Sequence, residues 1–219
     1  MKSSKLVERV LLFVVGLCIM AFGVSFSIKA ELGISPISSV PYVTSVISGL
    51  SVGVTTIIIN LLMIALQFVI LRKRSTVSML LQVPATLIFG TVIDIASAVI
   101  EPLSWLNYAG QWLFAIISII LIGTGISFEM ISNVTTTAGE GLVKVITMVA
   151  PIRFGTMKII FDATLVAISV IASLIFIGTI VGIREGTLAA ALLVGTVVKI
   201  EKKPFSGLSA FVAVSNAAN

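Results

Sequence analysis

One stretch of this chain occurs twice: AFGVSFSIKAELGISPISSVPYVTSVISGLSVGVTTIIINLLM at residues 21–63 and GTGISFEMISNVTTTAGEGLVKVITMVAPIRFGTMKIIFDATL at residues 123–165. The two copies align without a gap at an offset of 102 positions, and a later match follows at an offset of 105. The equivalent pairs include Gly23 and Gly125, Gly53 and Gly155, Asn60 and Asp162, and Gly90 and Gly195. Such self-similarity indicates that the chain consists of two halves with the same fold.

The composition indicates that lipid is the solvent for most of the chain. Of the 219 residues, 58% are hydrophobic and 11% are charged, whereas soluble domains carry about 25% charged residues. There is no histidine and one cysteine, Cys18, which argues against a typical zinc, copper or haem site. The sequence shows no nucleophile–base pair and no phosphate-binding loop of the kinds that would indicate an enzyme. We therefore expect neither a metal nor a cofactor.

The apolar runs predict an all-α polytopic membrane protein with six transmembrane helices. The whole chain, residues 1–219, then forms a single transmembrane domain, with a first repeat at 6–104, a second repeat at 110–203 and a C-terminal tail at 204–219. The expected spans cover residues 6–29, 51–71, 78–100, 111–132, 155–178 and 183–199.

The placement of basic residues predicts the orientation. With both termini in the cytoplasm, twelve of the fourteen lysines and arginines lie on the cytoplasmic side, and only Lys29 and Arg184 lie outside. The high pI therefore reflects membrane orientation, and we expect no nucleic-acid partner. Because three spans are an odd number, the second half must enter the membrane from the opposite side. The sequence therefore predicts two inverted three-helix repeats, an architecture common among transporters.

Each repeat also contains a short helix between its first and second spans, at residues 36–48 and 138–150. Each would reach about 20 Å, which is too short to cross a hydrocarbon core of about 30 Å. Ser35 precedes a proline at the first helical position, and Thr137 with Glu140 has the spacing of a capping box. Two interpretations stay open: the helices lie flat at the membrane interface, or they are re-entrant with their N-termini facing a polar cavity.

Ionisable residues within the predicted spans are the candidate site. Asp162 is the most informative, because a charge near mid-membrane is costly unless it is paired or hydrated. Lys158 lies one turn before it, so a structural ion pair is the alternative. Asp94 with its equivalent Lys199, and Gln67 with Gln82, are weaker candidates, and the paired glycines are expected to allow close helix contacts. The predicted substrate-binding residues are Asp162, Glu129, Glu140, Asn60, Asn133, Ser35 and Thr137.

A resemblance adds to these observations. The run Leu32-Gly33-Ile34-Ser35-Pro36, followed by Gly49-Leu50-Ser51-Val52-Gly53 and by Gly186-Thr187-Leu188 and Leu193-Val194-Gly195 in the last span, resembles the YczE/YyaS/YitT type of bacterial multi-pass membrane proteins. The resemblance implies a bacterial inner-membrane protein. It implies no substrate and no functional residues, since its motifs consist mainly of glycine, proline and apolar positions.

Together these features favour a secondary transporter of a small cationic or zwitterionic solute, with proton coupling left open. One alternative is the substrate-binding subunit of an energy-coupling-factor vitamin importer, although the first span lacks the Ala-x-x-x-Ala face typical of those subunits. A non-transporting membrane accessory or sensor protein is another alternative. The expected partners are a small-molecule solute and the lipid bilayer, and a homodimer stays open.

Overall fold

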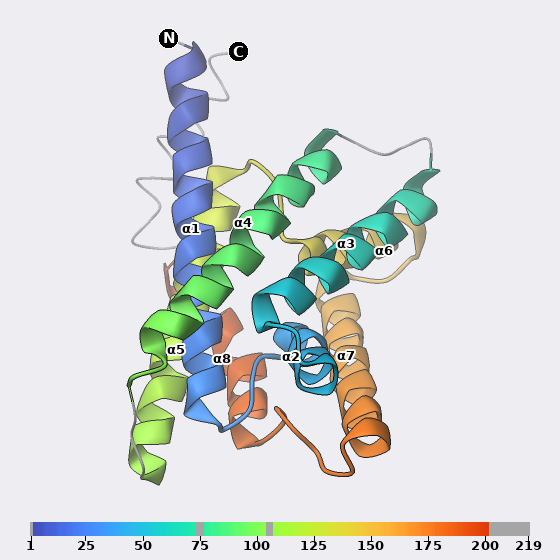
Figure 1. Ribbon diagram of the computed structural model, residues 1–219. Helices are drawn as coiled ribbons and strands as arrows, with labels where there is room; N and C mark the ends of the chain where they lie inside the picture. The colour runs from blue at the N-terminus through green and yellow to red at the C-terminus, as the bar shows by residue number, and fades with distance from the viewer. Residues whose placement is uncertain (1, 73–76, 104–106, 202–219) are drawn as a thin grey trace.

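The computed structural model describes residues 2–72, 77–103 and 107–201. In these residues the chain forms helices and no strand, which confirms the all-helical prediction (Figure 1). The predicted tail at 204–219 lies outside the described residues. The helices are α1 (Lys2–Ala30), α2 (Pro36–Ser48), α3 (Val52–Leu71), α4 (Val77–Ile100), α5 (Tyr108–Ser132), α6 (Ala138–Val149), α7 (Phe154–Phe176) and α8 (Glu185–Glu201).

Five of the described helices are long and apolar enough to cross a bilayer: α1, α3, α4, α5 and α7. The sixth predicted span corresponds to α8, which is apolar but has 17 residues. At about 1.5 Å per residue it reaches roughly 26 Å, slightly less than the hydrocarbon thickness of a typical bilayer. The described residues therefore contain five candidate spans and one shorter apolar helix.

The two short helices lie where the sequence places them. Helix α2 begins at Pro36, whose fixed φ suits the first helical position, and it ends at Gly49 in a left-handed conformation with φ of 71°. Helix α6 begins directly after Thr137. Each short helix packs against α3 and α7, so each contacts helices from both halves of the chain.

Both predicted side-chain caps are wrong, although Ser35 and Thr137 do occupy the N-cap positions. Neither hydroxyl accepts a hydrogen bond from its helix. The Ser35 hydroxyl donates to Ser38 Oγ over 3.1 Å. The amide of Thr137 donates to Glu129 Oε1 over 2.7 Å, so a carboxylate from α5 takes the place predicted for Glu140. A local spacing rule could not anticipate this contact, because the acceptor belongs to another helix.

Helices α1 and α5 form the most extensive pair in the structure and run antiparallel. They approach closely at two glycines that are equivalent in the repeat. A Cβ atom on Gly23 would lie 2.7 Å from the Ile122 side chain, and a Cβ atom on Gly125 would lie 2.7 Å from the Met20 side chain. Since Ile122 and Met20 are also equivalent positions, exchanging the two repeats exchanges the two contacts. These glycines confirm the predicted close approach.

The helices divide into two groups, which lie side by side in Figure 1. The α1 group comprises α1, α4, α5 and α8, and its apolar core includes Leu17, Ala21, Ile93 and Ile122. The α2 group comprises α2, α3, α6 and α7, and its core includes Leu142, Val143 and Phe161. The two members of an equivalent helix pair always lie in the same group: α1 with α5 and α4 with α8 in the first, and α2 with α6 and α3 with α7 in the second. The main contact between the groups is that of α3 with α4.

Candidate functional site

Glu129 lies in the last turns of α5, and its side chain is 1% exposed. Its Oε1 accepts the Thr137 hydrogen bond, and this contact joins the end of α5 to the start of α6. Its other oxygen, Oε2, is buried and has no hydrogen-bond partner among the described residues. Leaving a buried polar group unpaired costs about 1–3 kcal/mol, and more for a charged group. A proton at Oε2 would remove the buried charge, and a cation there would pair with it.

Glu140 lies in the first turn of α6 and is half-buried. Its charge interacts with Glu129 on α5 and with Lys158 and Asp162 on α7. Burial raises the pKa of Glu140, the positive charge of Lys158 lowers it, and the negative charge of Asp162 raises it again. The structure therefore brings together the three carboxylates of the predicted site, at the junction of α5, α6 and α7.

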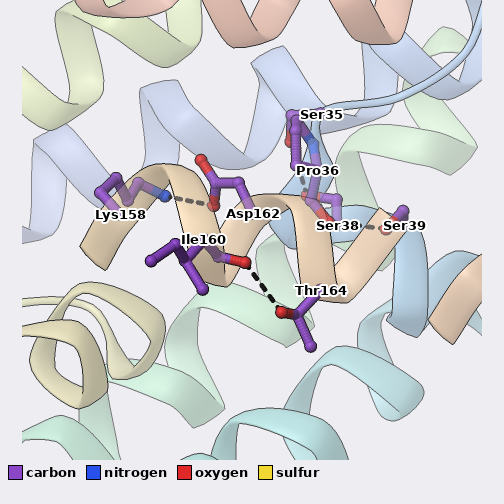
Figure 2. Close-up of polar contacts among 8 residues, drawn as sticks. All are labelled: Ser35, Pro36, Ser38, Ser39, Lys158, Ile160, Asp162 and Thr164. Atoms are coloured by element: carbon purple, nitrogen blue, oxygen red, sulfur yellow. Dashed lines mark hydrogen bonds and ion pairs between the residues drawn. The ribbon is translucent and has the colours of Figure 1, made fainter. Parts of the chain in front are cut away.

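Asp162 pairs with the lysine one turn before it on α7. The distance from Lys158 Nζ to Asp162 Oδ1 is 2.7 Å, and both side chains are partly exposed. Figure 2 shows Asp162 on the side of α7 where the first turn of α2 lies, and α2 packs against α7. This placement combines a structural ion pair with a position beside a helix N-terminus, which favours negative charge.

The other predicted site residues have different surroundings. Asn60, equivalent to Asp162, is half-buried on α3, the helix that packs against α6. Ser35 is buried and bonded to Ser38. Thr137 is half-buried, and its amide is held by Glu129. Asn133 is different: it is exposed and ends α5 in a left-handed conformation, and its carbonyl oxygen accepts from the Arg9 guanidinium.

Asp94 has a structural position near the start of α3. Its Oδ2 accepts from Ser51 Oγ over 2.6 Å, and its Oδ1 accepts from the Gly53 amide over 2.8 Å. The carboxylate thus binds the N-terminal turn of α3, where free amides and the helix dipole favour negative charge. It lies away from the three site carboxylates, so Asp94 fits the structural alternative.

A glutamine pair that the sequence offers as a weaker candidate forms a buried polar contact. Gln67 on α3 and Gln82 on α4 are both buried and exchange two amide hydrogen bonds, of 2.9 and 3.2 Å. Gln67 Nε2 also donates to the carbonyl oxygen of Ala138, over 3.0 Å, in the first turn of α6. The signal in the sequence was two uncharged polar residues within apolar spans. In the structure both side chains face Gly141, which leaves them room because it has no side chain.

The equivalent contact in the other repeat is smaller. Ser169 on α7 is the equivalent of Gln67, and Ser39 on α2 is the equivalent of Gly141. The Ser169 hydroxyl donates to Ser39 Oγ over 2.9 Å, and both side chains are buried. In one half the large side chain of Gln67 faces Gly141, and in the other half the small side chains of Ser169 and Ser39 face each other. The two arrangements fill equivalent places in the repeat. Each short helix is thus held by a buried polar contact to a span.

Comparison with known proteins identifies the family of this chain. Residues 7–203 match the model of a family of unknown function, DUF6198. The chain is 30% identical over 146 residues to the uncharacterized membrane protein YczE of Bacillus subtilis (strain 168), which covers 66% of each chain. It is 28% identical over 188 residues to the uncharacterized protein YyaS of the same organism, covering 85% of this chain and 88% of that protein. No solved structure matches. The chain is therefore a multi-pass membrane protein and belongs to the DUF6198 family.

Proposed function

We propose that this protein is a secondary transporter of a small cationic or zwitterionic solute, working by alternating access of two inverted repeats. One observation carries the proposal: the buried, unpartnered Oε2 of Glu129 lies at the junction where Glu140 and Asp162 also act. A carboxylate within a membrane helix is retained at a cost, and such residues commonly mark solute, ion or proton pathways. Three carboxylates with one lysine give a site that attracts positive charge.

The inverted arrangement is supported by the relation between equivalent helices. Helices α1 and α5 are equivalent in the repeat and antiparallel in space, and in Figure 1 α3 and α7 also run in opposite directions. The contact of Gly23 with Ile122 and that of Gly125 with Met20 are related by the same exchange. In this proposal α8 is the sixth span, and local thinning of the bilayer accommodates its length.

The orientation rests on charge. The start of α1 and the end of α3 lie at the same end of the bundle in Figure 1. Arg9 belongs to the first part of α1, and Arg72 directly follows α3. Lys29 and Arg184 lie near the opposite end, where Arg184 Nη1 donates to the carbonyl oxygen of Glu31. The positive-inside rule then puts the N-terminus in the cytoplasm, with the chain in the cytoplasmic membrane of a bacterium.

A proton would compete with the cationic solute for the same carboxylates. Glu140 is suited to this exchange, because burial raises its pKa above the ordinary value of a glutamate. A proton gradient could then drive the solute through the cycle. This coupling is part of the proposal and is tested together with solute binding.

The first experiment is a thermal-shift screen of the detergent-purified protein against small amines and amino acids. A ligand that binds only the folded state at 100 times its dissociation constant stabilises it by about 2.7 kcal/mol. We expect stabilising compounds to carry a positive charge, and we expect Glu129→Gln to abolish the shift. Active compounds then enter an uptake assay in proteoliposomes with an imposed pH gradient.

The matched control is Glu101→Gln, which removes the same charge from an exposed position at the end of α4. It should keep the ligand-induced shift and the uptake. If Glu129→Gln, Glu140→Gln and Asp162→Asn all transport like the unmodified protein, the acidic junction is not the solute site and the proposal is wrong.

A further inference from the structure

The two helix groups are joined mainly through α3 and α4, which meet at a pair of glycines. A Cβ atom on Gly53 would lie 2.1 Å from the Gly90 carbonyl oxygen, and one on Gly90 would lie 2.6 Å from that of Gly53. Both distances are shorter than any real contact of a methyl group, so the backbones touch at this point. Asp94 strengthens the contact by binding the Ser51 hydroxyl and the Gly53 amide.

The equivalent glycines of the second repeat are not approached by any other described helix. Gly53 corresponds to Gly155 on α7, and Gly90 corresponds to Gly195 on α8. Within the described part of the chain, no atom lies within 4 Å of a Cβ atom built on either residue. Among these residues, α7 and α8 show no packing comparable to that of α3 with α4.

This is the one helix contact that lacks a counterpart among the described helices. The contact of α1 with α4 recurs as that of α5 with α8, and the contact of α2 with α7 recurs as that of α6 with α3. The pairs α2–α3 and α6–α7 also correspond, as do α2–α8 and α4–α6. Each helix group is therefore symmetric within itself, and the asymmetry lies in how one group rests on the other.

We infer that the protein has a second state in which the α2 group tilts against the α1 group, so that Gly155 and Gly195 come together while Gly53 and Gly90 separate. This inference rests on the proposed function and describes its conformational change. Two such states would expose the acidic junction to opposite sides in turn. In the observed state the α3–α4 contact is closed and the α7–α8 contact is open.

The sequence difference between the two contacts explains which state is observed. Where the first repeat has Ser51 and Asp94, the second repeat has Arg153 and Lys199. The closed α3–α4 contact gains a carboxylate at a helix N-terminus. A closed α7–α8 contact has no carboxylate at either equivalent position, and Arg153 adds a positive charge at the N-terminus of α7. We therefore expect the α3–α4-closed state to be the resting state and the other to be less populated.

Cysteine cross-linking of full-length protein in proteoliposomes tests the inference. In a Cys18→Ala background, Gly155→Cys and Gly195→Cys are combined, oxidised with copper phenanthroline and tagged with maleimide-polyethylene glycol to count free thiols. A disulfide needs Cβ atoms about 3.8 Å apart, and among the described residues α7 and α8 are not packed against each other in the observed state. A reducible, intramolecular loss of two thiols therefore requires the helices to close.

Two control pairs calibrate the result. Ser25→Cys with Ser97→Cys joins α1 to α4, where the native hydroxyl oxygens are 3.0 Å apart, and should cross-link in either state. Thr156→Cys with Thr196→Cys lies one residue further along each helix and points in another direction, so its yield should stay low. Both threonines are exposed.

Gly53→Ala supplies a second measurement, since its methyl group opposes the α3–α4 contact. Among molecules that elute as monodisperse protein, it should raise the cross-linking yield of the Gly155/Gly195 pair above that of the parent. A yield no higher than that of the Thr156/Thr196 pair, with and without Gly53→Ala, would overturn the inference. A disulfide between two chains would overturn it too, because it would show that the glycines meet a second copy.

The readout counts thiols and needs no solute. Cross-linking without uptake of any tested solute would count against the proposed function alone. Uptake without cross-linking would count against this conformational change alone.

Discussion

Glu129 and Thr137 are joined by a 2.7 Å hydrogen bond in which the Thr137 amide donates to one carboxylate oxygen, while the other oxygen stays buried without a partner in the described chain. In the proposed function this one side chain has two tasks. Its bonded oxygen holds the start of α6 against the end of α5, and its unbonded oxygen is free for a proton or a cation.

The two tasks can be separated by substitution. Glu129→Gln keeps a carbonyl oxygen for the Thr137 amide and removes the buried charge, so we expect unchanged or higher thermal stability together with loss of solute binding. Glu129→Ala leaves a donor without its acceptor and should lower the free energy of unfolding by about 1–3 kcal/mol. Thermal unfolding in detergent measures both. Equal destabilisation by the two variants would show that the charge itself is needed for folding.

Gly141 should not tolerate a methyl group. A Cβ atom there would lie 2.6 Å from Gln82 Nε2 and 2.9 Å from Gln67 Oε1, inside a buried polar contact. We expect Gly141→Ala to destabilise the protein by about 1–3 kcal/mol, as overpacking of a core typically does.

Gly155→Ala is the matched control for this substitution. It lies in an open part of a helix, where alanine is favoured over glycine by about 0.5–1 kcal/mol. Similar unfolding temperatures for the Gly141→Ala and Gly155→Ala variants would contradict the packing described for the glutamine pair.

Lys158 should control the pH dependence of solute binding. Its positive charge lowers the pKa of Glu140, whereas burial and Asp162 raise it. Lys158→Met removes the lowering influence, so Glu140 becomes protonated at a higher pH. As pH falls, the loss of cation binding should therefore begin at a higher pH in Lys158→Met than in the parent. Thermal shifts by the active compound across a pH series measure this, and a displacement in the opposite direction would refute the assignment.

Arg9 should stabilise the end of α5. Its Nε donates to the Ser132 carbonyl oxygen over 2.8 Å, and its Nη2 donates to that of Asn133. A cation at a helix C-terminus contributes about 0.3–1 kcal/mol, and the lost hydrogen bonds add to this. We expect Arg9→Gln to lower the unfolding temperature without changing solute specificity. Arg184→Gln, which removes the corresponding bond to Glu31, provides a comparison at the end of α1.

The sequence was sufficient for the helices and, to within about four residues, for their ends. The short helices at 36–48 and 138–150 were recognisable because proline and capping-type residues mark their starts. The equivalent residues Glu31 and Asn133 even share a left-handed conformation, with φ of 56° and 47°. These features depend on backbone preferences within a few residues, which the local sequence contains.

The contacts across the helix groups were not predictable in this way. The capping box at Thr137 failed because Glu129, a buried carboxylate from another helix, took the amide that Glu140 was expected to bind. Nothing in the local sequence pairs Gln67 with Gln82, whose amides bond to each other while Gln67 also bonds to the first turn of α6.

Gly195 is the clearest case of a helix contact that the local sequence does not determine. It was expected to allow close helix contact, as its equivalent Gly90 does, yet no atom in the described chain approaches it. The same residue in the same local sequence thus has two environments in one molecule.

The repeat, the membrane character and the helix boundaries therefore follow from the chain itself, since periodic hydrophobicity and local backbone preferences determine them. Which glycine pair closes, which carboxylate oxygen stays unpaired and which amide it holds follow only from the packing of the two helix groups. The physical reason is that these contacts join residues from different helices, and the packing of equivalent surfaces can differ between two halves that share one sequence pattern.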